Sequence, residues 1–120
     1  MQMNAHRVNI VGLLQLIASE DEQEKYQEEV PFVSVPNEMC CQWFDDFYHP
    51  DSDEFLAEFA VEELQSFREF NQLYEKHVDS LPETLKELRK HSGWVKVSAL
   101  AKKIVQSYGW QNLKLEYDSD

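Results

Sequence analysis

Residues 53–78 read DEFLAEFAVEELQSFREFNQLYEKHV, and this stretch decides the fold class. Its apolar side chains recur at the three- and four-residue spacing of one helical face. The aromatic members form a stripe at Phe55, Phe59, Phe67, Phe70 and Tyr74. With Ser52 or Asp53 as the N-cap, the pattern predicts a single helix of about 25 residues. Stripes at this spacing are typical of helices that face a core, so we expect core packing rather than a ligand-binding box.

Before this stretch, the sequence predicts one helix and one extended segment. Apolar residues at helical spacing indicate a helix over residues 8–28, which Pro31 ends because proline cannot continue a helix. Val30 to Pro36 reads VPFVSVP, where β-branched residues and flanking prolines favour an extended backbone. Residues 37–48 stay open between helix and strand, because their apolar residues alternate while Asn37 could cap a short helix.

Two more helices are predicted after the stretch. Residues 80–83, SLPE, form a capping box with Pro82 in the first helical turn. A last helix covers residues 94–108, and Gly109 closes it. A small edge strand is allowed by the alternation of Leu113, Leu115 and Tyr117. The sequence therefore predicts a mainly α fold: a single domain of residues 1–120, a bundle of about four helices with one short extended segment between the first and the second.

Composition indicates a folded domain. Of its 120 residues 42% are hydrophobic, with only 3 glycines and 4 prolines, so the chain can bury a core without disulfides or metal. No run of about 18 apolar residues occurs, so no membrane-spanning segment is expected. The net charge of −12 argues against nucleic acid as a ligand. Cys40 and Cys41 are adjacent and poorly placed to bridge each other, so we expect free thiols and a cytoplasmic location.

Negative charge is concentrated in the N-terminal half. Residues 1–63 hold 15 acidic and 2 basic side chains, whereas residues 64–120 hold 8 acidic and 9 basic ones. A first acidic cluster consists of Glu20, Asp21, Glu22, Glu24, Glu28 and Glu29. A second consists of Asp45, Asp46, Asp51, Asp53, Glu54, Glu58, Glu62 and Glu63. Such clusters are either solvated faces that keep a small protein dispersed or docking surfaces for a basic partner.

The second cluster is interleaved with aromatic residues, which favours docking. Aromatic anchors among carboxylates are typical of tight protein interfaces, although at least two of the four aromatics at positions 43, 44, 47 and 48 should be buried. We expect Trp43 or Tyr48 to supply the anchor and the carboxylates to meet lysines or arginines of the partner. The candidate partner-binding residues are Trp43, Asp45, Asp46, Tyr48, Asp51, Asp53 and Glu54.

No motif of known catalytic or nucleotide-binding chemistry occurs in the chain: GxGxxG, GxxxxGK[ST], HExxH, CxxC and GxSxG are all missing. We therefore expect neither enzymatic activity nor a cofactor. One alternative is a small metal-dependent enzyme built on Asp45, His49 and Asp51, since carboxylates and imidazoles ligate metals. That segment lacks the glycine and the terminal glutamate of a calcium loop.

Three stretches carry a resemblance to known proteins: VPNEMCCQWFDDFYHPDSDEF at 35–55, FNQLYE at 70–75 and LPETL at 81–85. Over residues 35–95 the chain resembles small bacterial proteins, some of which are immunity proteins encoded beside toxin genes. The resemblance implies a small, acidic, cytoplasmic, non-enzymatic protein that binds and blocks a toxin domain, commonly a basic nuclease. It assigns no individual functional residue.

Charge and resemblance together favour a non-enzymatic inhibitory binding protein whose partner is a basic toxin domain. A DNA mimic is an alternative, in which the same carboxylates are spaced like phosphates and occupy a DNA-binding protein. A structural or adaptor domain is a third hypothesis, in which the acidic side chains serve only solubility.

Overall fold

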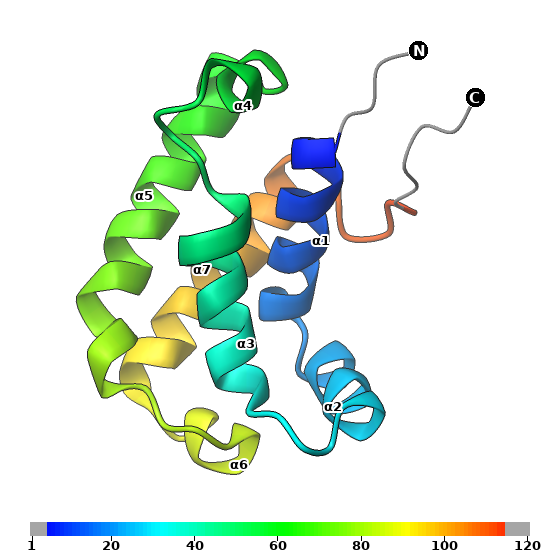
Figure 1. Ribbon diagram of the computed structural model, residues 1–120, viewed down its shortest axis with the longest axis vertical. Helices are drawn as coiled ribbons and strands as arrows, with labels where there is room; N and C mark the ends of the chain where they lie inside the picture. Colours follow the sequence, from blue (N-terminus) through cyan, green and yellow to red (C-terminus); the bar gives the residue numbers. More distant parts are fainter. Residues whose placement is uncertain (1–4, 115–120) are drawn as a thin grey trace.

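Helices form all the regular structure in residues 5–114, the part of the chain that the computed structural model describes (Figure 1). They are α1 (Ala5–Ala18), α2 (Glu20–Glu29), α3 (Val35–Cys41), the π-helix η1 (Gln42–Phe47), α4 (Asp53–Ala57), α5 (Val61–His77), the 3-10 turn η2 (Val78–Ser80), α6 (Leu85–Leu88) and α7 (Ser92–Ser107). The predicted mainly α class is confirmed, but the predicted number of about four helices is wrong. No helix in this range is long and apolar enough to cross a membrane.

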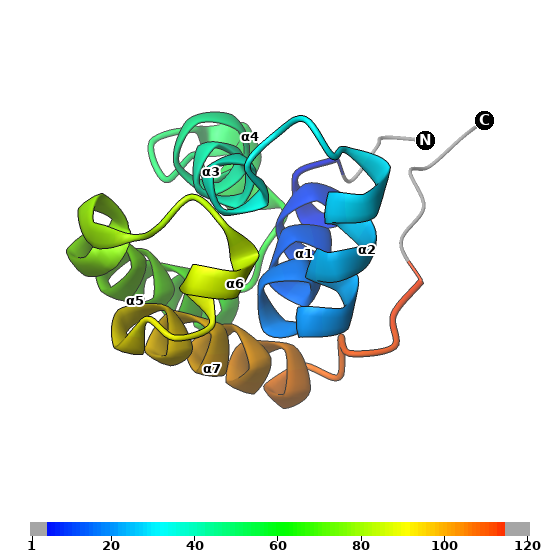
Figure 2. The ribbon, with the colours of Figure 1, turned by 90° about the horizontal axis from the view of Figure 1, so that it is seen from below.

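The core lies between α1, α5 and α7, with η1 placed over it. α1 packs along α7, and α5 packs against α7 as well. Figure 2 shows α7 on one side of the molecule and α3 and α4 on the opposite side. Trp43 of η1 fills the space between these layers, with its ring centroid 4.8 Å from that of Phe70 and 6.5 Å from that of Phe67. The predicted aromatic stripe is confirmed as core, since each of its five members is at most 8% exposed.

The predicted single helix over residues 53–78 is wrong, because the chain breaks between α4 and α5. Ala60 has an extended backbone there, with ψ of 159°. The break is held from α1: the Arg7 guanidinium donates to the Glu58 carbonyl oxygen at 2.8 Å and to both Glu63 carboxylate oxygens at 2.8 and 3.1 Å. The Ala60 N–H donates to Glu63 Oε1 at 2.7 Å. These contacts provide hydrogen-bond partners for the Glu58 carbonyl oxygen and the Ala60 N–H, which lack helical partners at the break between α4 and α5.

The first predicted helix also divides, into α1 and α2. Ser19 is extended, and its hydroxyl oxygen accepts a hydrogen bond from the Glu22 N–H at 3.2 Å, so it is the N-cap of α2. The buried Gln23 then reaches back and donates its amide hydrogens to the Leu16 and Ile17 carbonyl oxygens at 2.9 and 3.0 Å. The last turn of α1 is therefore capped by a side chain of α2.

The expected extended segment over Val30 to Pro36 is wrong. The chain makes a short turn and then enters α3 at Val35, with Ser34 as the N-cap. The Ser34 hydroxyl oxygen accepts from the Asn37 N–H at 3.3 Å, so Asn37 lies inside the helix and does not cap it. Residues 37–48, which were open between helix and strand, are helical through Phe47.

The predicted capping box at residues 80–83 does not start a helix. The Ser80 hydroxyl donates to the His77 carbonyl oxygen at 2.9 Å, so it faces back toward the preceding helix. The four-residue α6 is capped by Thr84, whose hydroxyl oxygen accepts from the Glu87 N–H at 3.3 Å. The local pattern was present, but a neighbouring carbonyl competed for the hydroxyl.

The last predicted helix, residues 94–108, agrees with α7 to within two residues at each end. His91 caps its start, with Nδ1 accepting from the Trp94 N–H at 3.3 Å. Gly93 in the first turn leaves room for a neighbouring ring, because a Cβ there would lie 2.5 Å from His77 Nδ1. Gly109 closes the helix with φ of 70°, as predicted.

The segment after α7 is irregular as far as the structure describes it. Trp110 packs back into the core, and the Gln15 amide donates to the Trp110 and Leu113 carbonyl oxygens at 2.7 and 3.0 Å. Of the expected edge strand, Leu113 lies in no strand, and Leu115 and Tyr117 lie outside the described residues.

Cys40 and Cys41 are expected to react at different rates in the native protein. Both are free thiols; Cys41 is exposed, whereas Cys40 is half-buried against the core. Burial raises the pKa of the Cys40 thiol, and electrostatic interactions with the neighbouring Cys41, Asp45 and Asp79 raise it further, so little reactive thiolate forms. Thiol titration should give one fast and one slow thiol in the native state and two fast ones after denaturation. Cys41→Ser should remove the fast phase, and two equally fast native thiols would contradict this arrangement.

Candidate functional site

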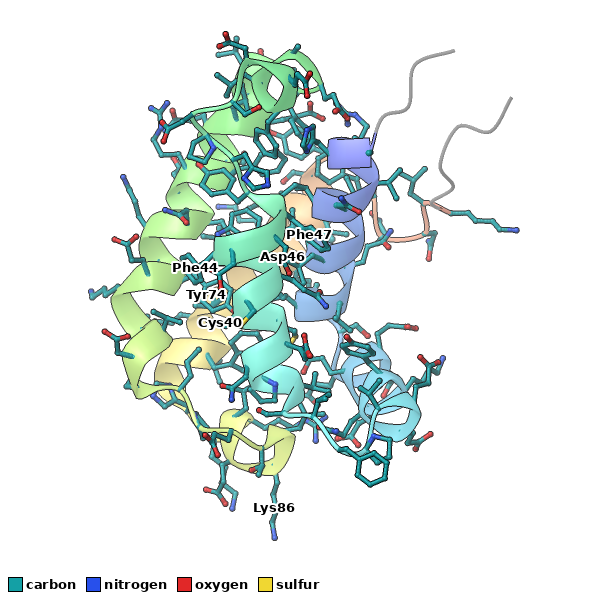
Figure 3. The ribbon with its side chains drawn as sticks, in the orientation of Figure 1. Cys40, Phe44, Asp46, Phe47, Tyr74 and Lys86 are labelled. Atoms are coloured by element: carbon teal, nitrogen blue, oxygen red, sulfur yellow. The ribbon has the colours of Figure 1, made fainter. Side chains whose placement is uncertain are left out.

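Five exposed carboxylates mark the strongest candidate site. They lie on η1, on the loop after it and at the start of α4, and we call them the acidic face: Asp45, Asp46, Asp51, Asp53 and Glu54. Figure 3 shows Asp46 on the outer side of η1, between Phe44 on the side of α5 and Phe47 on the side of α1. The sequence-predicted carboxylates are therefore accessible to a partner.

The π-helical turn of η1 sets this orientation. The Tyr48 N–H donates to the Trp43 carbonyl oxygen at 3.1 Å, a bond that spans five residues instead of four. The wider turn accompanies stacking of the Trp43 and Tyr48 rings, whose centroids are 4.7 Å apart with an interplanar angle of 12°. Phe44 packs beside Tyr74 of α5 at a centroid distance of 4.9 Å. The aromatic side chains of η1 thus hold it to the core and leave its carboxylates outside.

Hydrogen bonds brace the loop between η1 and α4. His49 Nε2 lies 2.7 Å from the Asp46 carbonyl oxygen, and because a carbonyl only accepts, Nε2 is the donor. The Ser52 N–H donates to the His49 carbonyl oxygen at 3.1 Å. The Ser52 hydroxyl oxygen accepts from the Phe55 N–H at 3.3 Å, which confirms Ser52 as an N-cap. The backbone that carries the carboxylates of the acidic face is therefore ordered by hydrogen bonds; we call this segment, residues 42–57, the braced frame.

The structure corrects the expected anchors. Trp43 is fully buried and its Nε1 donates to Asn71 Oδ1 at 3.0 Å, so it is a core residue with no surface for a partner. It is the only one of the four interleaved aromatics that is buried, whereas we expected at least two; the other three are half-buried. Tyr48, the other expected anchor, lines a shallow hollow of about 470 Å³ together with Asp51.

Tyr48 is neutral at physiological pH. Burial raises the pKa of its hydroxyl, the Arg68 charge opposes that rise, and the Asp51 charge adds to it. A neutral hydroxyl can both donate and accept hydrogen bonds. The hollow therefore offers a ring, a hydroxyl and a carboxylate side by side, which suits a basic side chain of a partner.

The first acidic cluster differs from the acidic face because several of its carboxylates form ion pairs within the fold. Arg89 binds Glu24 at 2.6 Å and lies 3.6 Å from Glu20, and Lys25 lies 3.6 Å from Glu22. Acidic residues in the first turn of α2 also interact favourably with the helix dipole. The first cluster is thus partly neutralised inside the fold.

The carboxylates of the acidic face form no ion pair within residues 5–114. Another member of the second cluster does: Glu63 binds Arg7. Glu58 lies close to α1 as well, with the Arg7 backbone N–H donating to Glu58 Oε1 at 3.0 Å. The acidic face therefore carries uncompensated negative charge on the surface of a chain whose net charge is −12.

The residues of the metal-enzyme alternative do not form a metal site. In the described part of the chain, no group of three or more His, Cys, Asp and Glu side chains is arranged to hold a metal ion. His49 Nε2 is already engaged by the Asp46 carbonyl, as described above. Asp45, His49 and Asp51 are therefore not brought together as ligands.

A larger cleft of about 1300 Å³ lies between the α1–α2 pair and α7. Sequence reasoning missed it, because its walls come from segments that are far apart in the chain, with Gln15, Tyr26, Trp94 and Leu113 among them. Arg89 lines the cleft too, but its guanidinium group forms ion pairs with carboxylates of α2. The cleft is open and mixes apolar with charged walls, so it favours no particular ligand.

Comparisons with known proteins add no assignment: no protein-family model, no curated protein and no solved structure matches the chain.

Proposed function

We propose that this protein is a non-enzymatic inhibitory binding protein of the immunity type. Its acidic face docks onto a basic toxin domain, for which a nuclease is the expected class. The observation that carries the proposal is the set of five exposed carboxylates on a braced frame, without an ion-pair partner in the described residues. The resemblance over residues 35–95 supports the same class.

The electrostatics favour a basic partner. Like charges gathered on one surface repel each other, and a partner with the opposite charge relieves this repulsion. Complementary surfaces also steer the two proteins together, which raises the association rate more than the affinity. The two free thiols, one of them exposed, suit a reducing compartment, and we propose the cytoplasm.

Reversing the charge at Asp45 and Asp46 is expected to slow association without unfolding the protein. Both side chains are exposed, so Asp45→Lys with Asp46→Lys should leave the thermal unfolding midpoint nearly unchanged. The partner is recovered by pull-down at low salt, and association rates are measured at increasing ionic strength. At low salt we expect the variant to associate about 10-fold more slowly or worse, and the difference to shrink as salt screens the charges.

The matched control places the same charge change elsewhere. Glu69 and Glu75 are exposed on α5, and Glu69→Lys with Glu75→Lys changes net charge equally. We expect a smaller effect from this control, because steering depends on the local field. A wild-type association rate that does not depend on salt would refute electrostatic docking. Displacement of the partner by duplex DNA would favour the DNA-mimic alternative.

A further inference from the structure

The turn between α2 and α3 presents a large apolar side chain to solvent. Phe32 is 98% exposed and Val33 is 37% exposed, and both follow Pro31. Moving an apolar side chain out of water lowers the free energy, but the fold does not bury the Phe32 side chain. An exposed phenylalanine on a loop is available to a partner, because loops carry much of the recognition in proteins and aromatic residues are enriched in the buried parts of protein interfaces.

This turn, residues 30–34, is held in place by hydrogen bonds. The Gln27 amide donates to the Val30 and Val33 carbonyl oxygens at 3.1 and 2.9 Å, and the Val33 N–H donates to the Val30 carbonyl oxygen at 3.2 Å. The Ser34 hydroxyl donates to the Glu83 carbonyl oxygen at 2.5 Å. Because the backbone of the turn is already ordered, binding through Phe32 has to order only its side chain, which reduces the entropy cost of the complex.

Phe32 and the first two carboxylates of the acidic face, Asp45 and Asp46, lie at opposite ends of one continuous helix. α3 and η1 have 7 and 6 residues, and at a rise of about 1.5 Å per residue they span roughly 20 Å. In Figure 2 the turn lies on the same side of the molecule as α3 and α4, while Figure 1 shows the turn at the lower end of α3 and α4 at the upper end of the molecule. A standard interface of about 800 Å² per partner is roughly 30 Å across, so one partner can cover Phe32 together with Asp45 and Asp46.

Charge indicates what kind of pocket receives Phe32. Exposed Glu28 and Glu29 precede the turn, and exposed Glu83 lies beside it through the Ser34 contact. A second copy of this chain would bring another net charge of −12 to the contact, which disfavours self-association. The surroundings favour an apolar pocket with a basic rim.

We propose that Phe32 is the apolar anchor of the docking surface and inserts into an apolar, basic-rimmed pocket of the same protein that the acidic face binds. This inference rests on the proposed function and adds to it the residue that holds the complex together. Charge then governs association, and burial of Phe32 governs dissociation.

Photo-crosslinking in the cells that make the protein tests whether one partner covers both sites. p-Benzoylphenylalanine replaces Phe32, Asp46 or, as the control, Val95 in the full chain. Val95 is 53% exposed and belongs to α7, the helix that Figure 2 shows on the side of the molecule opposite α3 and α4. We expect positions 32 and 46 to capture the same protein and position 95 not to capture it. Capture of a second copy of the chain at position 32, or of a protein different from the one at position 46, overturns the anchor.

Kinetics with the captured protein separate the anchor from the proposed function. Phe32→Ala should raise the dissociation rate about 30-fold or more and leave the association rate and its salt dependence unchanged. Val95→Ala should change both rates by about two-fold at most. An unchanged dissociation rate for Phe32→Ala, with salt-dependent association intact, overturns the anchor alone. A wild-type association rate without salt dependence overturns the proposed function instead.

Two further measurements complete the test. The unfolding midpoint of Phe32→Ala should equal that of the wild type, because the side chain makes no core contact, and a lower midpoint would overturn its role as a free anchor. Sedimentation with phosphatidylcholine vesicles should leave the wild-type protein in solution. Vesicle binding that Phe32→Ala removes would overturn the protein pocket in favour of a membrane surface.

Discussion

Phe67→Ala is expected to lower the free energy of unfolding by about 3–5 kcal/mol, as truncations of large buried side chains do. Phe67 is fully buried at the centre of the aromatic core. Its ring centroid lies 5.0 Å from that of Phe59, 6.3 Å from that of Trp110 and 6.5 Å from that of Trp43. Alanine would leave a cavity among rings from three segments, and stiff aromatic neighbours cannot collapse to fill it.

Chemical denaturation measures this loss. Gln72→Ala on the same helix is the matched control, because Gln72 is exposed, and it should change stability by about 0.5 kcal/mol or less. A loss below about 1 kcal/mol for Phe67→Ala would be inconsistent with a packed aromatic core.

Arg7→Ala is expected to cost about 3 kcal/mol, the second-largest effect. The guanidinium of Arg7 binds both Glu63 oxygens and the Glu58 carbonyl, and its Cζ lies 5.1 Å from the ring centroid of Phe59. Removing it leaves the Glu63 carboxylate, whose side chain is 10% exposed, without its cation. A buried charge that loses its partner destabilises a protein more than the intact pair stabilises it.

The contribution of Glu63 should depend on pH. Burial raises the pKa of Glu63, but hydrogen bonds from Arg7 and Ala60 and the positive charge of Arg7 lower it, and the net pKa lies below the ordinary value of 4.5. A depressed pKa in the folded state stabilises the protein above pH 4.5, and this stabilisation is lost as pH falls through the folded-state pKa.

Denaturation of the wild type, Arg7→Ala and Glu63→Gln at several pH values tests the pair. The stability difference between the wild type and Glu63→Gln should be constant near neutral pH and shrink below pH 4.5. Lys103→Ala removes an exposed cation from α7 and serves as the control, with an expected effect of about 0.5 kcal/mol or less. If Arg7→Ala behaves like that control, the ion pair does not hold the break between α4 and α5.

Where the sequence predicted well, the signal was local. The helical spacing of the aromatic stripe identified five core residues, because the side chains of one helical face are buried together. The N-cap at Ser52, one of two candidates, and the end of the last helix at Gly109 were also readable, since each depends on a few consecutive residues. The exposure of the five carboxylates followed from their charge.

Where the sequence predicted poorly, long-range contacts decided. The break between α4 and α5 depends on Arg7, which lies 56 positions before Glu63. Periodicity could not reveal the break, because the apolar spacing continues through it. The same holds for the capping box at Ser80, whose hydroxyl binds the carbonyl oxygen of His77 instead.

The two candidate anchors, Trp43 and Phe32, also show the difference between what local sequence predicts and what long-range contacts decide. From sequence alone, Trp43 was an anchor candidate, and Phe32 was one apolar residue in a segment expected to be extended. The sequence by itself determined that the chain is helical, that its stripe is core and that its N-terminal half is acidic, because spacing and charge are properties of the chain. Tertiary structure alone decided that Trp43 is buried with Asn71 as its partner, while Phe32 stands on a turn braced by Gln27. Burial depends on which distant side chains close over a residue, and that is settled only when the helices pack together.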